Sequence, residues 1–426
     1  MNTIVTKFGG SSLADSIHFK KVKNILESNP ERKYIIPSAP GKSSFKDFKI
    51  TDLLYLCHAH VKSGISLDDV FKLISERYKS IVDDLNLNLD LTSYLNIIKT
   101  DIENGASVDY TASRGEYLNG IILANYLNID FIDAKDVIKF NKYGTLNIEE
   151  TYVALKDKLS NHERAVIPGF YGSNEHGDIV TFSRGGSDIT GALVAASINA
   201  KLYENWTDVS GFLMADPRIV NNPKKIKTIT YGELRELSYM GASVLHEEAV
   251  FPVRTSGIPI NIRNTNEPEN EGTLIVSNEI KHENTITGIA GKQNFTVLSI
   301  EKSMMNSELG FCRKILTILE QNGVSFENMP SGIDTVSVVI SDSNLKNKTE
   351  IIVEEIKRAC NMALIATVGT GMAYTKGVAS KIFTALAESD INIRMIDQGS
   401  SEINVLVGIE NDDFEKGINA IYKAFN

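Results

Sequence analysis

Short apolar runs alternate with longer stretches of helical periodicity over the first two-thirds of the chain. Each run ends in polar or glycine-rich sequence, which is typical of strands that lead into loops. The predicted strands are Thr3–Lys7, Tyr34–Pro37, Phe131–Asp133, Ala165–Pro168 and Lys201–Thr207. Because these strands alternate with helices, the pattern predicts an α/β sheet. A helical insertion is predicted over Leu67–Glu103.

The pattern changes after the loop-like stretch Asn264–Gly272, and an internal repeat follows. Gly310–Leu319 and Gly377–Leu386 carry Gly, Lys, Ile, Thr and Leu at the same offsets. The correspondence continues from Val324–Phe326 to Ile391–Ile393. Each repeat predicts a helix with an apolar stripe, a hairpin of two strands and a second helix. Two such units are expected to pack side by side and share one sheet.

Length and composition limit the classes of protein. At 426 residues the chain exceeds the roughly 250 to 300 residues at which single cores stop growing. The predicted domains cover residues 1–285, 286–362 and 363–426. A net charge of -10 argues against nucleic acid or an anionic membrane as partner, since either requires clustered lysine and arginine. We expect neither secretion nor membrane insertion, because the start of the sequence has the pattern of a short strand and no apolar stretch of about 20 residues occurs.

Cysteine usage gives no sign of disulfides or of a bound metal. The three cysteines, Cys57, Cys312 and Cys360, are widely spaced and odd in number, so we expect a cytoplasmic protein. Cys57-His-Ala-His60 resembles a metal cluster, but it continues a helical stretch in which the two histidines point to different faces. We therefore expect no protein-bound metal.

Candidate chemistry is sought in the loops after the strands, where ligands of open α/β sheets bind. Lys7-Phe-Gly-Gly-Ser-Ser12 follows the first predicted strand. Its glycines let backbone N–H groups approach phosphate oxygens, and its lysine supplies a positive charge for a transferring phosphoryl group. The order of Lys and Gly differs from a Walker A loop. An ordinary tight turn has the same composition, so this loop alone leaves both interpretations open.

Two further loops carry polar groups of the same kind. In Phe182–Gly191, Gly185 and Gly186 free the backbone, and Ser187 or Asp188 is expected to cap the helix that follows. The neighbouring Arg184 is suited to hold a carboxylate through two hydrogen bonds. The loop Trp206–Arg218 is dense in turn residues and suits either a nucleotide or a plain β-turn.

Three motifs in this order resemble the signature of aspartate kinases, within the amino-acid kinase superfamily. They are Lys7-Phe-Gly-Gly-Ser-Ser12, Ser183-Arg-Gly-Gly-Ser-Asp188 and Trp206-Thr-Asp-Val-Ser-Gly211 with Ala215-Asp-Pro-Arg218. The tandem repeat after residue 290 resembles the paired ACT domains of the same enzymes. The resemblance implies an αβα sandwich around a mainly parallel sheet, followed by two ferredoxin-like ACT units. It further implies transfer of phosphate from ATP to L-aspartate, the first step of lysine, threonine and methionine biosynthesis.

The resemblance also assigns roles to residues, position by position. Lys7 would stabilise the transferring phosphoryl group, and Asp188 would organise the site. The aspartate site would comprise Ser38, Thr51, Glu116 and Arg184. The site for ATP, which brings its own Mg²⁺, would comprise Lys7, Gly9, Gly10, Ser11, Thr207, Asp208 and Arg218. These charges suit a zwitterion with an extra carboxylate, because Arg184 offers a cation and Glu116 an anion.

The ACT pair implies feedback regulation by lysine, threonine or both, in a homodimer formed through these domains or in a tetramer. The implied effector residues are Met305, Ser307, Gly310, Phe311, Ser325, Glu327 and Asp334. Two positions depart from the family pattern, since Ser243 stands where a lysine is frequent and Leu213 where some relatives have an aromatic residue. Two alternatives remain: a kinase of the same fold for glutamate or acetylglutamate, and a catalytically weak amino-acid sensor.

Overall fold

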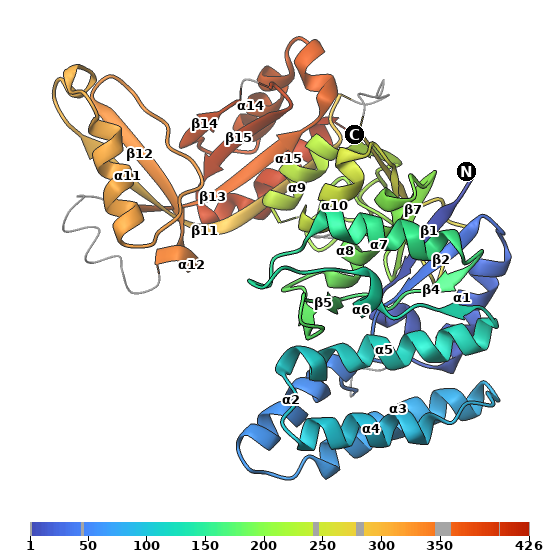
Figure 1. Cartoon of the computed structure of the whole chain (residues 1–426). Coiled ribbons are helices and arrows are strands. Elements are labelled where there is room, and N and C mark those ends of the chain that lie inside the picture. Colours follow the sequence, from blue (N-terminus) through green and yellow to red (C-terminus); the bar gives the residue numbers. More distant parts are fainter. Residues whose placement is uncertain are drawn as a thin grey trace. The chain divides into compact units, whose positions relative to one another are not determined.

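The computed structural model describes residues 2–43, 47–241, 247–277, 285–345, 359–399 and 401–425 (Figure 1). It contains two compact units, each built from several stretches of the chain. The first comprises Met1–Phe212, Lys225–Tyr231 and Val244–Asn278, and the second comprises Leu213–Lys224, Gly232–Ser243 and Glu279–Asn426. No helix within the described residues is long and apolar enough to cross a membrane.

An eight-stranded sheet forms the centre of the first unit, with strand order β3-β4-β2-β1-β7-β9-β10-β8. The strands are β1 Ile4–Phe8, β2 Arg32–Pro37, β3 Asp130–Phe131, β4 Ala165–Val166, β7 Leu202–Thr207, β8 Thr228–Thr230, β9 Ile260–Asn264 and β10 Thr273–Val276. All neighbours from β3 to β9 are parallel, whereas β10 runs antiparallel to β9. The mainly parallel α/β sheet predicted from the alternating pattern is confirmed.

Successive side chains of β7 show what covers the two faces of this sheet. Tyr203 and Asn205 point toward helix α8 (Gly186–Ser197), since both bond Asp188 of that helix. Trp206 points to the opposite face, where its ring stacks on Phe8. This face belongs to the buried apolar cluster that includes helix α1 (Ser16–Glu27) and helix α5 (Val108–Leu127).

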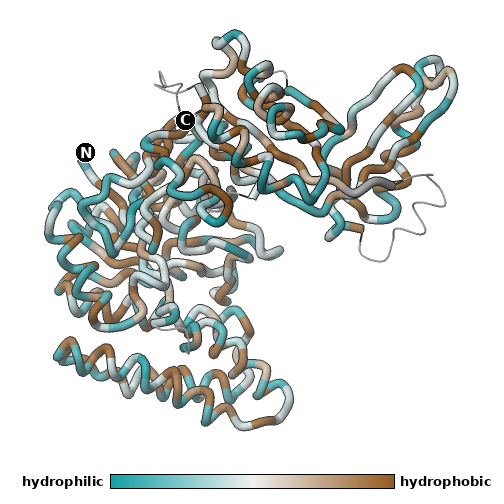
Figure 2. Tube along the Cα trace, turned by 180° about the vertical axis from the view of Figure 1, so that it is seen from behind, coloured by the Kyte–Doolittle hydropathy of each residue, from teal (hydrophilic) through white to brown (hydrophobic). Residues whose placement is uncertain are grey.

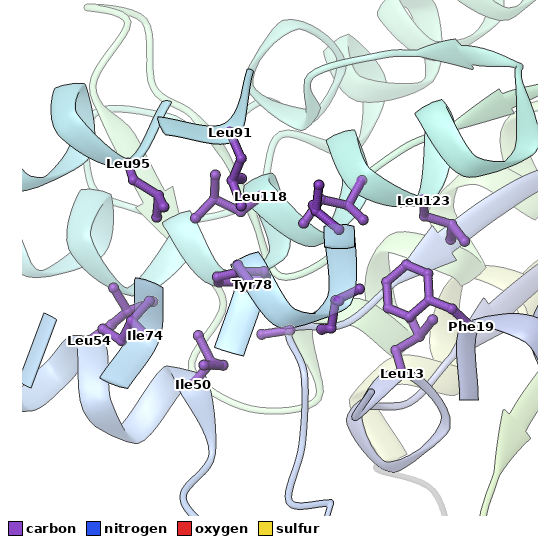
Figure 3. Close-up of a cluster of buried hydrophobic side chains, with 14 of the residues drawn as sticks. Leu13, Phe19, Ile50, Leu54, Ile74, Tyr78, Leu91, Leu95, Leu118 and Leu123 are labelled. Atoms are coloured by element: carbon purple, nitrogen blue, oxygen red, sulfur yellow. The ribbon is translucent and has the colours of Figure 1, made fainter. Parts of the chain in front are cut away.

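The same cluster extends into the helices of the predicted insertion. Helices α2 (Ile50–Lys62), α3 (Asp68–Asp84) and α4 (Leu91–Glu103) supply Ile50, Ile74 and Leu95, which lie in the same buried cluster as Leu118 of α5 (Figure 3). Along α3 and α4 apolar residues recur at helical spacing, so brown and teal alternate along both helices in Figure 2. The insertion predicted over Leu67–Glu103 is confirmed.

The remaining elements of the first unit flank the sheet. They are α6 Ala134–Val137, α7 Ile148–Ser160, α10 Glu247–Thr255 and the antiparallel hairpin β5 Tyr171–Ser173 with β6 Ile179–Thr181. The hairpin leads into α8 through the segment that contains Arg184. This short connection places the second predicted loop next to the sheet.

The second unit contains a five-stranded antiparallel sheet with strand order β12-β11-β13-β15-β14. Its elements are β11 Gly288–Glu301, β12 Thr335–Ser341, β13 Ala359–Val368, β14 Met395–Asp397, β15 Asn404–Ile409, α11 Phe311–Gln321, α12 Asp342–Leu345, α14 Val378–Glu388 and α15 Phe414–Phe425. Helix α9 spans Tyr231–Tyr239. Its first residue, Tyr231, belongs to the first unit, and the rest of the helix belongs to the second. The repeats share one sheet, as predicted, because β11 pairs with both β12 and β13. The domain boundaries at residues 285 and 362 stay predictions.

Neither repeat forms the first strand of its hairpin at the predicted segment, since β14 of the second repeat begins only at Met395, beyond Ile391–Ile393. Val324–Phe326 forms no strand, and two isolated bridges, from Asn328 and Ser331 to β12, stand in its place. Pro330 lies between these two residues and has no N–H to donate to a ladder. The expected hairpin of the first repeat is therefore wrong in its first strand.

Candidate active site

The carboxyl ends of the neighbouring parallel strands β2, β1 and β7 bring three distant loops together. The N–H of Gly9 donates to the carbonyl oxygen of Trp206 at 2.9 Å. The N–H of Ser38 donates to the carbonyl oxygen of Phe8 at 3.0 Å. The glycine loop after β1 thus adjoins the loops after β2 and β7, at the edge where ligands of such sheets bind.

Close backbone approach explains the second glycine of this loop. The N–H of Gly41 donates to the carbonyl oxygen of Gly10 at 2.8 Å. A Cβ on Gly10 would lie 2.8 Å from the carbonyl oxygen of Ala39, so a larger residue there would force the backbone to move. The N–H of Gly9 is already bonded, whereas the N–H groups of Gly10 and Ser11 bond no other described residue. The N–H of Gly9 therefore stabilises the turn, and the N–H groups of Gly10 and Ser11 are the free hydrogen-bond donors of this loop.

Lys7 and Asp188 form a buried ion pair beside this loop. Lys7 Nζ lies 2.6 Å from Asp188 Oδ1, and the two side chains are only 10% and 14% exposed. Solvent and salt therefore screen the pair weakly. Asp188 belongs to the first turn of α8, so the positive end of the helix dipole lies beside the pair.

Helix α8 begins earlier than the sequence predicted. Its N-cap is Gly185, in a left-handed conformation with φ of 58°, and its first residue is Gly186. Neither Ser187 nor Asp188 caps the helix, because both lie inside its first turn. The N–H groups of Gly186, Ser187 and Asp188 bond no other described residue. They form a second set of free donors near the ion pair.

Glu116 of α5 is a buried carboxyl with an incomplete set of partners. Its side chain is buried, and its Oε2 atom has no hydrogen-bond partner among the described residues. Burial raises the pKa of Glu116 to about 7, while a hydrogen bond from the N–H of Ala39 and the positive charge of Arg114 act against this rise. A carboxyl of this kind changes its charge near neutral pH.

Ser38 and Thr51 lie on the segments that adjoin this carboxyl. Asn119, one turn beyond Glu116 in α5, donates from Nδ2 to the carbonyl oxygen of Ser38 at 2.6 Å. The N–H of Ile50 donates to the carbonyl oxygen of Pro40 at 3.2 Å, and Thr51 follows in the first turn of α2. The structure thus links Ser38, Thr51 and Glu116 through the loop after β2.

The other predicted residues are divided between the two units. Arg184 is exposed at the entry to α8, and Asp208 is exposed after β7, where it accepts a hydrogen bond from Thr207 Oγ1 at 3.1 Å. Arg218 lies in the second unit, where its guanidinium bonds Asp216 at 2.5 Å. Leu213 also lies in the second unit, and Ser243 falls outside the described residues.

Sequence reasoning missed a buried charged network under β7. Glu204, only 2% exposed, accepts two hydrogen bonds from Arg32, at 2.8 and 3.0 Å, and one from the indole N–H of Trp206 at 2.8 Å. Arg263 of β9 lies 3.7 Å from the same carboxylate. The network holds Trp206, whose carbonyl oxygen binds Gly9. Its signal in the sequence is two adjacent polar residues inside a run predicted to be a buried strand.

Two further residues near the site were also missed. Asn205 of β7 donates to Asp188 Oδ1 at 2.8 Å. Phe170 adopts a left-handed backbone with φ of 79°, which is unusual for a residue other than glycine. A Cβ on Gly186 would lie 2.8 Å from the Cα of Phe170, so this strained residue packs directly against the start of α8. Nothing in the sequence pattern indicates this conformation.

The predicted effector residues fall into two groups in the second unit. Met305 is buried, and its N–H donates to Asp334 Oδ1 at 3.4 Å. Ser307 follows Met305 in the same short turn, and Gly310, with φ of 77°, is the N-cap of α11, which begins at Phe311.

The second group lies between α11 and β12. Glu327 accepts a hydrogen bond from the hydroxyl of Tyr239 in α9. Ser325 Oγ accepts one from Asn344 at 2.9 Å.

The histidines of α2 show no sign of a metal centre. His60 Nδ1 forms a hydrogen bond with the carbonyl oxygen of Ser66 at 2.9 Å, and Cys57 is a buried free thiol. Across the described part of the chain, no three His, Cys, Asp or Glu side chains are grouped so that they could hold a metal ion. His58 and His60 are both half-buried on α2.

Comparisons with known proteins agree with this geometry. The family model described as "Amino acid kinase family" matches residues 2–264, and the model described as "ACT domain" matches residues 365–425. Aspartokinase 3 of Bacillus subtilis is 36% identical over 445 residues, which cover 99% of this chain and 98% of that protein.

Solved structures extend the comparison to the whole chain. The crystal structure of an aspartate kinase from Clostridium acetobutylicum, described as an allosteric enzyme, has 64% sequence identity and a TM-score of 0.93, with 100% of both chains covered. Aspartokinase III of E. coli, in complex with aspartate and ADP, has 24% identity and a TM-score of 0.75 with 99% of both chains covered. Its complex with lysine and aspartate has a TM-score of 0.78 and 100% coverage of both chains. At that identity the E. coli structures show the fold alone.

The glycine loop with its ion pair, the parallel sheet and the ACT repeat thus occur together in a chain that is related over its full length to known aspartokinases, so this chain belongs to the amino acid kinase family and, within it, to the aspartokinases.

Proposed function

We propose that this chain transfers the γ-phosphoryl group of MgATP to the β-carboxylate of L-aspartate, giving ADP and 4-phospho-L-aspartate. The observation that carries the proposal is the buried pair of Lys7 and Asp188, held between the glycine loop and the N-terminus of α8. Free N–H donors, a buried ammonium and a helix dipole are the groups that neutralise phosphate oxygens. Family membership supports the same reaction.

Catalysis in this site rests on position and charge. Lys7 meets the phosphoryl group as negative charge spreads over its oxygens, while Gly10 and Ser11 donate to the neighbouring phosphate. Thr207 and Asp208 contact the nucleotide at the end of β7. Mg²⁺ arrives with the nucleotide, bound to its phosphates. Transfer is direct, so no phosphoenzyme forms.

Aspartate binding uses charges of both signs. Arg184 pairs with the α-carboxylate through its planar guanidinium, and Glu116 pairs with the α-ammonium. The unpartnered Oε2 of Glu116 supports this assignment, because a buried carboxylate oxygen without a donor is costly unless a ligand supplies one. Ser38 and Thr51 hold the β-carboxylate in line with the phosphoryl donor.

An assay of ADP release tests the reaction and its acceptor together. We expect ADP release from the full chain with aspartate, and little with glutamate or acetylglutamate, because one methylene moves the reacting carboxylate away from the phosphoryl group. A hydroxamate test for the acyl phosphate checks that phosphate reaches the carboxylate. Turnover with glutamate or acetylglutamate that exceeds turnover with aspartate would assign another acceptor, and no turnover with any of them would favour a sensor.

The pH dependence of aspartate use should follow the charge of Glu116. Below pH 7 this carboxyl gains a proton, because burial raises its pKa to about 7, and the neutral acid no longer attracts an ammonium group. We expect kcat/KM for aspartate to fall about tenfold for each pH unit below 7 and to be level above it. Steady-state rates from pH 5.5 to 8.5 measure this. Glu116→Gln should give a low and flat profile; a slope that persists in that variant would assign the titration to another group.

We further propose that lysine, threonine or both inhibit the enzyme through the ACT repeat. Glu327 holds the effector ammonium and the N–H groups at the start of α11 hold its carboxylate, in a site that also includes Met305, Ser307, Ser325 and Asp334. The hydroxyl of Tyr239 already donates to Glu327, so the effector ammonium must displace this donor or share the carboxylate with it. By linkage, effector and aspartate must then weaken each other's binding.

Calorimetric titration of the full chain tests the regulatory proposal. We expect heat of binding from lysine or threonine, and a weaker effector affinity in the presence of saturating aspartate. Glu327→Gln should abolish that heat without changing the rate in the absence of effector. Absence of binding by either amino acid, alone or together, would remove the proposal.

The assembly and the location of the enzyme belong to the same proposal. We propose a homodimer formed through the ACT repeats, or a tetramer assembled from such dimers, and a role in the cytoplasm at the first step of lysine, threonine and methionine biosynthesis. Cys57 and Cys312 are free thiols, which is the state that a reducing compartment maintains.

A further inference from the structure

Asn205 occupies a position that the resemblance to other aspartokinases did not assign. In the parallel pairing of β1 with β7, Lys7 stands opposite Asn205. Side chains at paired positions of neighbouring strands project to the same face of a sheet. Both residues therefore reach the face covered by α8, where Asp188 lies in the first helical turn.

The three side chains form a closed set of contacts. Asn205 Nδ2 donates to Asp188 Oδ1 at 2.8 Å, the same oxygen that lies 2.6 Å from Lys7 Nζ. Lys7 Nζ in turn donates to Asn205 Oδ1 at 3.5 Å. Asn205 is only 4% exposed, so water does not replace these bonds freely. One amide thus contacts both members of the ion pair.

The strand that carries Asn205 is itself held firmly. Tyr203, two residues earlier on the same face, donates its hydroxyl to the carbonyl oxygen of Asp188 at 3.1 Å. A Cβ on Gly191 would lie 2.6 Å from the hydroxyl oxygen of Tyr203, so α8 approaches β7 closely at this point. On the opposite face Glu204 is bound by Arg32. The amide of Asn205 therefore projects from a strand that is fixed on both faces.

We propose that Asn205 is a positioning residue for phosphoryl transfer, which fixes the direction of the Lys7 ammonium and of the Asp188 carboxylate; this inference rests on the proposed function. An amide suits the role because it donates and accepts at once. The amide donates to Oδ1 of Asp188, the same oxygen that pairs with the Lys7 ammonium. The ammonium therefore keeps N–H groups that can donate to phosphate oxygens. Leucine has nearly the same shape with neither group, and aspartate at this position would add a second negative charge.

Kinetics of Asn205→Leu in the full chain test the inference. We expect kcat to fall about a hundredfold, which is the scale for a catalytic group that loses its alignment. The KM values for ATP and aspartate should stay within about threefold, because both substrates keep their own contacts. The melting temperature and the calorimetric affinity for ADP are measured alongside. Asn205→Ala gives the same test if the leucine variant does not fold.

The matched control is Thr6→Val, a buried polar residue next to Lys7 that points to the other face of β1 and bonds the carbonyl oxygen of Tyr34. It should leave kcat unchanged. A kcat within threefold of the unmodified enzyme overturns the inference, whether measured on Asn205→Leu or, if that variant does not fold, on Asn205→Ala. A loss that falls on KM alone overturns it as well. If the unmodified chain does not phosphorylate aspartate, the proposed function fails instead, so the two failures are distinguishable.

Discussion

Lys7→Ala is expected to lower kcat by about a thousandfold, the largest kinetic effect that we predict. The substitution removes the only cation that lies within 4 Å of Asp188 among the described residues. Interactions with charge that develops in the transition state have effects of this size in buried sites. The affinity for aspartate should change little, because Lys7 acts on the phosphoryl group. Steady-state assays of ADP release, with ADP affinity measured by calorimetry, test both expectations.

The control for this prediction is another lysine of the same sheet. Lys33 of β2 reaches Glu163 at 4.0 Å with a side chain that is 34% exposed, and Lys33→Ala should keep the normal rate. Circular dichroism of Lys7→Ala should show an unchanged fold, since Asn205 still donates to Asp188. Normal turnover by Lys7→Ala would rule out the mechanism proposed here.

Glu204→Leu is expected to produce the largest loss of stability, about 3 to 5 kcal/mol of unfolding free energy. The substitution leaves the guanidinium of Arg32, whose side chain is 6% exposed, without its carboxylate in a buried position. It also leaves the indole N–H of Trp206 without an acceptor. Urea denaturation of the variant and of the unmodified chain measures the difference. Activity should fall as well, because Trp206 holds the glycine loop.

Two further variants distinguish the contribution of the buried ion pair to the unfolding free energy from that of a surface ion pair. Glu31→Gln breaks the pair with Lys201, whose side chain is 54% exposed, and should change the unfolding free energy by less than about 0.5 kcal/mol. Arg32→Met combined with Glu204→Leu should recover part of the loss, because the uncompensated charge of Arg32 is then gone while that of Arg263 remains. If Glu204→Leu alone costs as little as Glu31→Gln, the buried network does not stabilise the fold.

Local patterns predicted the elements of this fold well. The strands at Thr3–Lys7 and Lys201–Thr207 and the insertion at Leu67–Glu103 appear within a residue or two of their predicted bounds, since apolar periodicity over short windows determines them. The strand predicted at Val324–Phe326 is wrong because strand pairing in this segment depends on which residues face β12. Pro330 interrupts the hydrogen-bond ladder with β12.

The candidate site was predictable only where its residues lie in recognisable loops. Lys7 and Asp188 stand in such loops, whereas Asn205 and Phe170 become significant through sheet register and a close helix approach, which a single sequence does not reveal. Gly9 was expected to offer a free N–H, yet register places it against Trp206. The burial of the Glu116 carboxyl likewise depends on which loop covers it.

The long strand β11 has a consequence for how the C-terminal repeat forms. Over Gly288–Leu298 it pairs with β13, and over Phe295–Glu301 it pairs with β12, so a single strand belongs to the ladders of both repeats. A fragment that ends before β13 would leave one side of β11 as an open edge, which invites pairing with other chains. The two repeats must therefore fold as one cooperative body, and neither can be lost by truncation without exposing the other to aggregation.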